Sequence, residues 1–328
     1  MYNLEFDYCI GEFMVYCRSR QLREKTMSSY EQALRLFERW CREQMNICEV
    51  DKVTESAVRR YINELQERGK YTFFCDDKTK DINYPERRRD FRKPVSPCTI
   101  NNYIQNLRVF FNWLDSDYLL KKNPMRKIKQ LKVNRQAKEY ISDEDFKRLV
   151  SSLDKSYFSE HRDFAMIMLM MDSGMRLGES SCLTAYDIDL AHKQILLRVD
   201  ITKGRKDSVV FFSPKTEMLL RRWLQYKDRY IETDYLFPIK STGYHVDVNG
   251  FETNFKRYLR RAGLNVNITP HCLRNNFAKR CLMGGMDIYT LSRLLGHSSV
   301  TVTEQAYLDL TDSDNGKRYQ HFSPIRNM

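Results

Sequence analysis

The segment 271–307 holds an acid/base side chain, an anion-binding side chain, a second imidazole and a phenol within thirty-seven residues. Thr269 is predicted to cap a helix whose first position is Pro270, so His271 and Arg274 would share one face of its opening turns. A helix N-terminus presents unpaired N–H donors and roughly half a positive charge, and Arg274 adds a forked guanidinium. The pattern favours a bound anion, and a phosphate is its natural ligand.

The elements after this helix position the other two side chains. A Gly-Gly pair at 284–285 is predicted to end the helix, and Asp287 to cap a second helix that stops at Gly296. His297 would lie in the following turn, and a short helix would carry Tyr307. Taken singly, such residues are usually structural: a histidine caps a helix, an arginine pairs with an acid, and a tyrosine fills a core. Their conjunction indicates a site.

The segment resembles the C-terminal signature of the tyrosine recombinases, which include phage and transposon integrases and chromosome-dimer resolvases. That signature is a His-x-x-Arg helix, a Leu-Gly-His turn and a nucleophilic tyrosine further on. The chain matches it at His271, Arg274, 295–297 and Tyr307. It departs at Asn275, where many members have a second histidine, and we expect this position to be supporting rather than catalytic.

The resemblance implies an earlier arginine. The segment 173–179 follows the apolar run 164–171 and looks like the family's first arginine motif. Arg176 would be the second anion-binding guanidinium. Glu179, one helical turn further on, would orient it.

The resemblance also implies a lysine on a β-hairpin. The runs 194–199 and 208–212 have the composition of strands and flank a basic turn, which predicts a hairpin. Lys203 corresponds to the family's lysine, and Lys206 is the near alternative. Arg205 lies between them. For most hairpin lysines, a solvated turn charge is the ordinary interpretation.

The activity that the resemblance implies is a phosphodiester transfer. Such a reaction builds negative charge on the non-bridging oxygens, deprotonates a nucleophile and protonates the departing sugar oxygen. The implied roles are phosphate binding by Arg176 and Arg274, attack by Tyr307, proton acceptance by His271, proton donation to the 5′-oxygen by Lys203, and a hydrogen bond to the phosphoryl oxygen from His297. The covalent 3′-phosphotyrosine would permit rejoining without ATP, and no metal ion or other cofactor is implied.

The fold is expected to be mainly α-helical, with one small sheet. Four or five short amphipathic helices should make residues 1–120 an all-α unit, which resembles the family's core-binding domain. Residues 139–328 would be an α+β catalytic domain with a C-terminal tail, and 121–138 the linker. In recombinases of this type the tail often docks on the adjacent protomer.

Three of the N-terminal helices have recognisable starts. Ser28 and Glu31 form a capping-box pattern, Thr54 precedes the second apolar stripe, and Pro97 opens the third. A further helix is expected before Arg20.

Two basic stretches concern binding. The linker carries eight basic residues and no acid, which predicts contacts with DNA phosphates: Lys121, Lys122, Arg126, Lys127, Lys129, Lys132, Arg135 and Lys138. Arg205 and Lys206 of the hairpin are further candidates. The segment 71–94 is a polar, charged insertion. The sequence leaves three interpretations of this segment open: a contact with DNA, a contact with a neighbouring subunit, or a disordered insertion.

The composition agrees with this assignment. A net charge of +12 and a pI near 9.2 favour an anionic partner, although charge alone does not separate nucleic acid from acidic membranes. The longest apolar run is too short for a bilayer, so no membrane partner is expected. Nine widely spaced cysteines show no zinc pattern, and they indicate reduced, mostly buried thiols in a cytoplasmic protein. The resemblance implies a bacterial or phage protein that is associated with the nucleoid when it is bound to DNA.

The sequence therefore predicts a site-specific recombinase of double-stranded DNA that acts as a homo-tetramer through a four-way (Holliday) junction. Integration and excision of a mobile element is the preferred role, with accessory DNA-bending or directionality proteins as candidate partners. The alternatives are a dimer resolvase, a type IB topoisomerase, a DNA-binding protein without activity, and a metal-dependent transposase.

Overall fold

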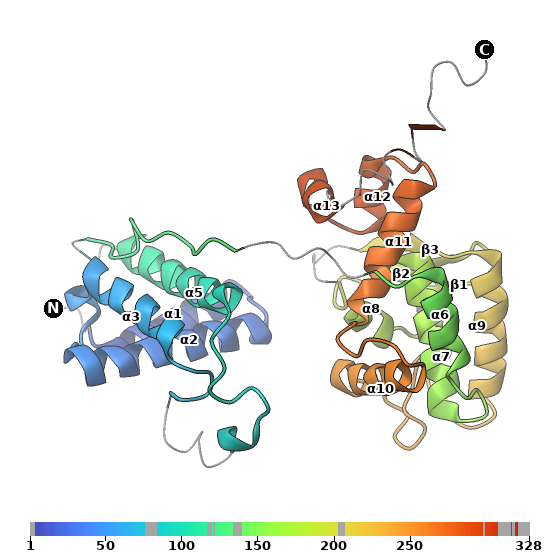
Figure 1. Ribbon diagram of the computed structural model, residues 1–328, viewed down its shortest axis with the longest axis horizontal. Helices are drawn as coiled ribbons and strands as arrows, with labels where there is room; N and C mark the ends of the chain where they lie inside the picture. Colours follow the sequence, from blue (N-terminus) through green and yellow to red (C-terminus); the bar gives the residue numbers. More distant parts are fainter. Residues whose placement is uncertain are drawn as a thin grey trace. The chain divides into compact units, whose positions relative to one another are not determined.

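The computed structural model describes residues 4–75, 84–116, 120, 122–133, 140–202, 207–297, 299–307, 316 and 319–320, with only the backbone for 302 and 305–307. The chain divides into two compact units, Met1–Arg135 and Gln136–Met328. Figure 1 shows a helical first unit and a second unit that combines helices with one small sheet. The predicted fold class is confirmed.

The first unit is an all-helical bundle around an aromatic core. Its helices are α1 (Phe6–Ser19), α2 (Glu24–Met45), α3 (Glu55–Glu67) and α5 (Pro97–Ser116), with 3-10 turns at Val50–Lys52 and Pro85–Arg87. Phe13, Phe37 and Tyr61 are fully buried, and Phe37 meets the Tyr61 ring edge-on at 5.0 Å between centroids. The predicted helix before Arg20 is α1, and Thr54 caps α3 by accepting from the Ala57 N–H at 3.2 Å.

The predicted start of α2 at Ser28 is wrong. The helix begins at Glu24, one turn earlier, and no side chain caps it. The extra turn buries Met27, which is 5% exposed. Burial of this side chain outweighs the local capping pattern, because an apolar side chain in the core contributes more than one cap.

The basic stretch after α5 packs on the first unit as far as the structure describes it. Asn101 on α5 donates to the Leu131 carbonyl at 3.0 Å and accepts from the Leu131 N–H at 2.7 Å. Met125 and Ile128 are buried in the core of that unit. The backbone of 122–133 is therefore held against α5, while its basic side chains remain exposed.

The described ends of the 71–94 insertion are joined at a stem. Gly69 and Pro94 form a β-bridge, the Lys70 N–H donates to the Lys93 carbonyl at 2.9 Å, and the Arg92 N–H donates to the Lys70 carbonyl at 3.1 Å. A Cβ on Gly69 would lie 2.4 Å from the Arg92 Cα, so only glycine permits this approach.

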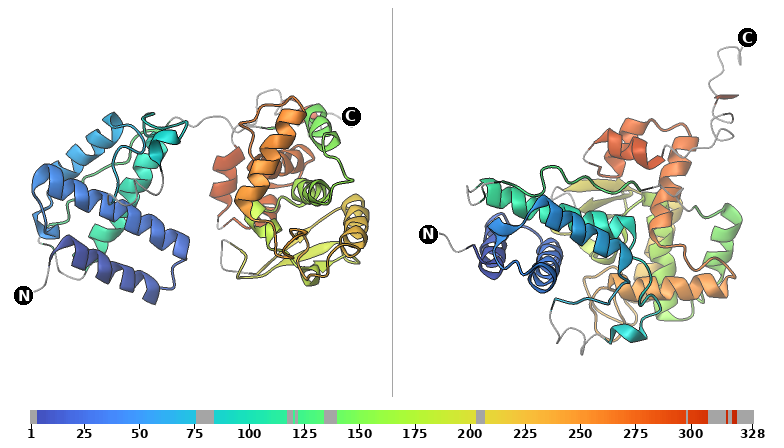
Figure 2. Two further views of the ribbon diagram at one scale, coloured as in Figure 1. Left: turned by 90° about the horizontal axis from the view of Figure 1, so that it is seen from below. Right: turned by 60° about the vertical axis from the view of Figure 1, so that its left-hand side comes forward.

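The second unit is built around a buried central helix, α7. Its elements are α6 (Asp143–Ser151), α7 (Phe158–Ser173), α8 (Leu177–Ser181), a 3-10 turn (Ala185–Asp187), β1 (Ile188–Asp189), β2 (Gln194–Leu197), β3 (Ser208–Phe211), α9 (Pro214–Lys227), α10 (Val248–Arg261), α11 (His271–Met283), α12 (Ile288–Leu294) and α13 (Val300–Tyr307). Helices α9 and α11 both pack against α7. Figure 2 shows the same unit from two further sides.

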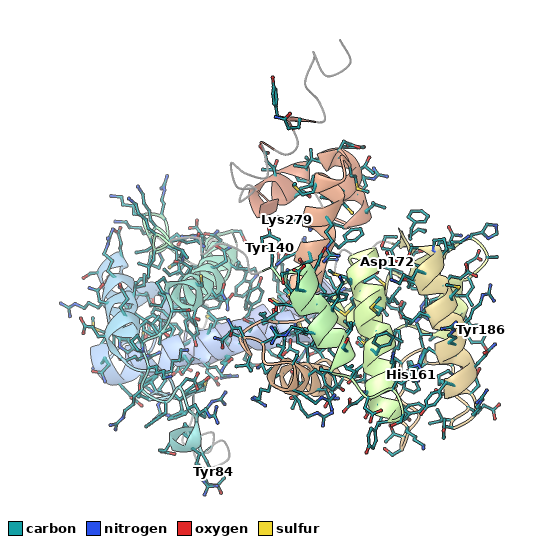
Figure 3. The ribbon with its side chains drawn as sticks, turned by 45° about the vertical axis from the view of Figure 1, so that its right-hand side comes forward. Tyr84, Tyr140, His161, Asp172, Tyr186 and Lys279 are labelled. Carbon is teal, nitrogen blue, oxygen red and sulfur yellow. The ribbon has the colours of Figure 1, made fainter. Side chains whose placement is uncertain are left out.

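The sheet is antiparallel, in the order β1-β2-β3, and Ile195 of β2 pairs with Val210 of β3. The predicted hairpin is thus confirmed, with strands slightly shorter than expected. Ile195 and Val210 face the core. Asp172, labelled in Figure 3, accepts from the Ser213 N–H at 2.6 Å and so ties the exit of the hairpin to the end of α7.

Helices α12 and α13 form a small subassembly with α11. Figure 1 shows them beside α11, away from α10. Ala278 and Leu282 of α11, Leu291 of α12 and Leu295 just beyond it make a separate apolar cluster. This cluster fixes the turn that carries His297 relative to α11.

Candidate active site

Arg274 is the centre of the candidate site. It lies one turn into α11 and is only 4% exposed. Its guanidinium donates to the Gly174 carbonyl at 2.7 Å, and also to the Leu295 carbonyl. The same guanidinium lies 3.2 Å from Nε2 of His297. Arg274 therefore connects the end of α7, the end of α12 and the His297 turn.

The Gly174 carbonyl reaches Arg274 because of the backbone at the end of α7. Gly174 is the C-cap of that helix and has a left-handed φ of +69°. A Cβ at this position would lie 2.3 Å from the Phe277 ring of α11. Left-handed backbone and close packing together make glycine necessary here.

Arg176 and Glu179 are in direct contact. The Arg176 guanidinium donates to Oε1 of Glu179 at 2.7 Å, and the Arg176 N–H donates to Oε2 at 3.0 Å. Glu179 is 4% exposed, whereas the Arg176 side chain is 29% exposed. The buried carboxylate therefore fixes a partly accessible guanidinium at the start of α8.

His271 is the first residue of α11 and is exposed. The helix starts one residue later than predicted, although Pro270 already has helical dihedrals (φ −55°, ψ −23°). The carbonyl of Thr269 accepts from the Cys272 N–H at 2.9 Å.

His297 lies in the predicted turn. Asp287 caps α12 by accepting from the Thr290 N–H at 2.9 Å, and Gly296 (φ +59°) turns the chain after it. The Nδ1 atom of His297 is 2.7 Å from Oγ1 of Thr303. The imidazole is thus held through both ring nitrogens, by Arg274 on one side and Thr303 on the other.

Thr303 was missed by the sequence reasoning. Its side chain is fully buried on α13. A threonine gives no signal of its own. Its spacing of four from Tyr307, which puts both residues on one helical face, could have drawn attention to it.

Asn275, where many family members have histidine, is 7% exposed. Its Oδ1 atom is buried and has no hydrogen-bond partner among the described residues. The side chain lies next to Arg274 in sequence but makes no described contact with it.

Several predicted site residues lie outside the described part of the chain. Tyr307 is the last residue of α13, and only its backbone is described. The residues outside are Lys203, Arg205 and Lys206 of the hairpin, and Lys121, Arg135 and Lys138 of the basic stretch. The remaining basic candidates are exposed: Lys122, Arg126, Lys127, Lys129 and Lys132.

Among the described residues, no three His, Cys, Asp or Glu side chains gather where they could hold a metal ion. None of their helices combines the length and apolarity needed to cross a bilayer. The nine cysteines are free, and four of them are buried, fewer than the sequence suggested: Cys9, Cys17, Cys41 and Cys272.

A helical unit followed by an α+β unit with an Arg, a His-x-x-Arg and a Leu-Gly-His motif is the organisation of a tyrosine recombinase. The model of the phage integrase family matches residues 139–314, and that of the phage integrase N-terminal SAM-like domain matches residues 10–73. Because the first match covers more than half of the chain, the protein belongs to the phage integrase family.

Curated relatives bear the same class name. A tyrosine recombinase from Thermosipho africanus is 25% identical over 280 residues, which cover 82% of this chain and 93% of the relative. Tyrosine recombinase XerC from Actinobacillus pleuropneumoniae is 30% identical over 218 residues, covering 66% of this chain and 70% of the relative.

Two solved structures share the fold. The Tn1549 transposon integrase in complex with a circular intermediate DNA superimposes with a TM-score of 0.70 at 17% identity, covering 97% of this chain and 100% of that one. The XerH site-specific recombinase bound to its difH substrate gives a TM-score of 0.67 at 20% identity, covering 93% and 81%.

Proposed function

We propose that the protein is an active site-specific recombinase. It cuts and rejoins double-stranded DNA through a covalent 3′-phosphotyrosine and a Holliday junction, as a homo-tetramer on paired sites. Its proposed role is integration and excision of a mobile element. The observation that carries this proposal is the buried Arg274 guanidinium, held by two backbone carbonyls and facing the His297 ring.

Arg274 and Arg176 would bind the scissile phosphate. A guanidinium has five N–H donors in a rigid fork. The carbonyls of Gly174 and Leu295 orient the Arg274 fork before DNA arrives, and Glu179 does the same for Arg176. Donors fixed in advance stabilise the developing charge without reorganisation during the reaction.

The proton transfers would use the other predicted side chains. Tyr307 is the nucleophile, and a phenol of ordinary pKa near 10 must lose its proton as it attacks. His271, exposed at the start of α11, accepts that proton. Lys203 protonates the departing 5′-oxygen, and His297 donates to the phosphoryl oxygen.

The decisive test uses a suicide substrate, a duplex of the recombination site with a nick beside the cleavage position. The site itself is found first by mapping the DNA that the protein protects near the ends of its own gene. Wild-type protein should form a denaturation-resistant adduct, and Tyr307→Phe should form none. An equal adduct from Tyr307→Phe would refute this nucleophile. Tyr289→Phe is the matched control, because Tyr289 is 59% exposed on α12.

The second candidate role is resolution of chromosome or plasmid dimers. It is favoured by the curated relatives, several of which are named tyrosine recombinase XerC or XerD. Protected DNA at the junction of an element with its host would support integration. Protected DNA confined to one chromosomal or plasmid locus would support resolution.

Two further assays distinguish the proposed recombinase from a type IB topoisomerase and from a metal-dependent transposase. A type IB topoisomerase would relax supercoiled DNA that lacks the recombination site, whereas the proposed recombinase would not. A metal-dependent transposase would lose strand cleavage in EDTA, whereas a phosphotyrosine mechanism continues there.

A further inference from the structure

We infer that Thr303 is a positioning residue that holds the His297 ring and lets its Nε2 atom change from hydrogen-bond acceptor to donor when phosphate binds. This inference rests on the proposed function, since it concerns how His297 acts there. It goes beyond that function because it adds a residue and a step to the site.

Two contacts of the His297 ring indicate which ring nitrogen carries the proton in the free protein. The Arg274 guanidinium can only donate, so the Nε2 atom at 3.2 Å from it is an acceptor. In a neutral imidazole the proton then lies on Nδ1. Nδ1 therefore donates to Oγ1 of Thr303, at 2.7 Å.

The proposed role of His297 requires the opposite arrangement. To donate to a phosphoryl oxygen, Nε2 must carry a proton. In the neutral ring, one proton then leaves Nδ1 for solvent and another reaches Nε2 from solvent, with no net change in charge. Nδ1 becomes an acceptor.

A hydroxyl is suited to both states because it can either accept or donate by rotating its hydrogen. Thr303 accepts from Nδ1–H in the free protein and would donate to Nδ1 once Nε2–H faces the phosphate. The ring plane is kept throughout. A buried partner that could only accept would stabilise the ring with its proton on Nδ1 and would oppose the ring with its proton on Nε2.

Thr303 also joins His297 to the helix of the nucleophile. It lies four residues before Tyr307 on α13, hence on the same helical face. Its side chain is fully buried, and α12 packs against α13. The hydrogen bond therefore connects the phosphate-binding turn to the helix that carries Tyr307.

The experiment compares Thr303→Val, which keeps the shape and removes the hydroxyl, with Thr303→Ser, which keeps the hydroxyl. Adduct formation on the suicide substrate should slow by about 10- to 100-fold in Thr303→Val, the size of loss found when the hydrogen-bond partner of a metal-binding histidine is removed. Thr303→Ser should restore most of the rate. DNA affinity and melting temperature control for folding, and Thr301→Val, at an exposed position of α13, is the matched control.

A double-mutant cycle distinguishes positioning from packing. If Thr303 acts through His297, Thr303→Val should have no further effect on the adduct rate in a His297→Ala background. An equal additional loss in that background would overturn the inference. So would a wild-type rate for Thr303→Val.

A second measurement does not depend on activity. The ring-nitrogen NMR signals of His297, assigned with His297→Ala, should show the proton on Nδ1 in the free protein and should change in Thr303→Val. Unchanged signals would refute the role of Thr303. Absence of any adduct from wild-type protein would instead count against the proposed function, so the two failures are distinguishable.

Discussion

The carbonyl oxygen of Gly174 accepts a hydrogen bond from the Arg274 guanidinium at 2.7 Å, across one hundred residues of sequence. The contact joins the end of α7 to α11, the helix that carries His271 and Arg274. It depends on a backbone conformation and on a close approach that a larger residue would disturb.

Gly174→Ala should therefore impair both stability and activity. The added Cβ meets the Phe277 ring at 2.3 Å, and overpacking of this kind costs about 1–3 kcal/mol. The left-handed φ adds about 1 kcal/mol more. Urea unfolding measures the loss of stability, and the suicide substrate measures the loss of adduct. Gly285 also has a left-handed φ, but a Cβ there would meet open space. Gly285→Ala should therefore lack the steric contribution to the loss of stability. Equal stabilities for both variants would contradict this account.

Arg274→Lys should nearly abolish adduct formation while leaving DNA binding largely intact. Lysine keeps the charge but cannot hold two carbonyls and face His297 with one rigid fork. Loss of a preorganised donor of this kind costs about 10²–10³-fold in rate. Single-turnover adduct formation beside a gel-shift titration separates the two effects. Arg280→Lys is the control and should retain activity. Arg280 lies on α11, like Arg274, but it forms an exposed ion pair with Asp143 of α6.

Asp163→Asn should strongly destabilise the second unit. The buried Asp163 carboxylate accepts from Arg162 at 2.7 Å, from the Tyr258 hydroxyl at 2.7 Å and from Asn254 at 3.0 Å. Its removal leaves the charge of Arg162 buried without a counterion, which costs about 3–5 kcal/mol. Chemical denaturation measures this. Asp145→Asn, which breaks an exposed pair, should cost less than about 1 kcal/mol. Comparable losses of stability in Asp163→Asn and Asp145→Asn would contradict a larger contribution from the buried Asp163 hydrogen bonds.

Stability should fall as the pH drops below about 6.5 because of His161. Burial, helped by Lys155, lowers the pKa of His161 from its ordinary value. Its ring lies on α7 (Figure 3), with centroids 4.6 Å from Tyr226 and 5.3 Å from Trp223 of α9. The unfolded chain therefore binds a proton more tightly, and the contribution present above that pH is lost on acidification. Melting temperatures between pH 7.5 and 5.5 should fall less in His161→Phe.

The control for that measurement is His192→Gln, because His192 is exposed and pairs with Asp189 on the surface. This variant should keep the acid sensitivity of the wild type. The same pH dependence in His161→Phe and in the wild type would remove His161 as its source.

The basic stretch after α5 should contribute to the salt dependence of DNA binding. Lys122, Arg126 and Lys127 are exposed on a segment whose backbone is fixed. Each one that contacts a phosphate should add roughly 0.9 to the slope of log affinity against log salt, so single replacements by Gln should lower it by that amount. Lys52→Gln is the control, since Lys52 already pairs with Glu49 and Asp51. An unchanged slope in all three variants would exclude phosphate contacts here.

Much of the fold could be predicted because its signals are local. The Asp287 cap, the start of a helix at Thr54 and the pairing of the two hairpin strands each follow from a few neighbouring residues, and the structure has them. The start of α2 could not be predicted in this way, because burial of Met27 depends on helices distant in sequence.

In the candidate site too, features with a local signal could be predicted, and contacts between residues distant in sequence could not. Arg176 was predicted from the resemblance of 173–179 to the family's first arginine motif, and Glu179 was predicted to orient it from one helical turn further on; the two side chains are in contact. The partners of Arg274 could not be predicted, because two of them are backbone carbonyls, and any residue supplies a carbonyl. The contact of His297 with Thr303 was also invisible, since a buried threonine resembles any small core residue.

The stem at Gly69 and Pro94 has a consequence for how this chain tolerates change. Because the bridge brings the two ends of the insertion together, it connects α3 to α5 by a short path through the stem. Beyond the stem, the Phe74 carbonyl also accepts from Arg39 of α2 at 3.4 Å. Doubling a loop of this kind costs only about 0.6 kcal/mol of closure entropy. The stem therefore limits what a change in the length of the insertion can do to the bundle, because α3 and α5 remain joined at Gly69 and Pro94.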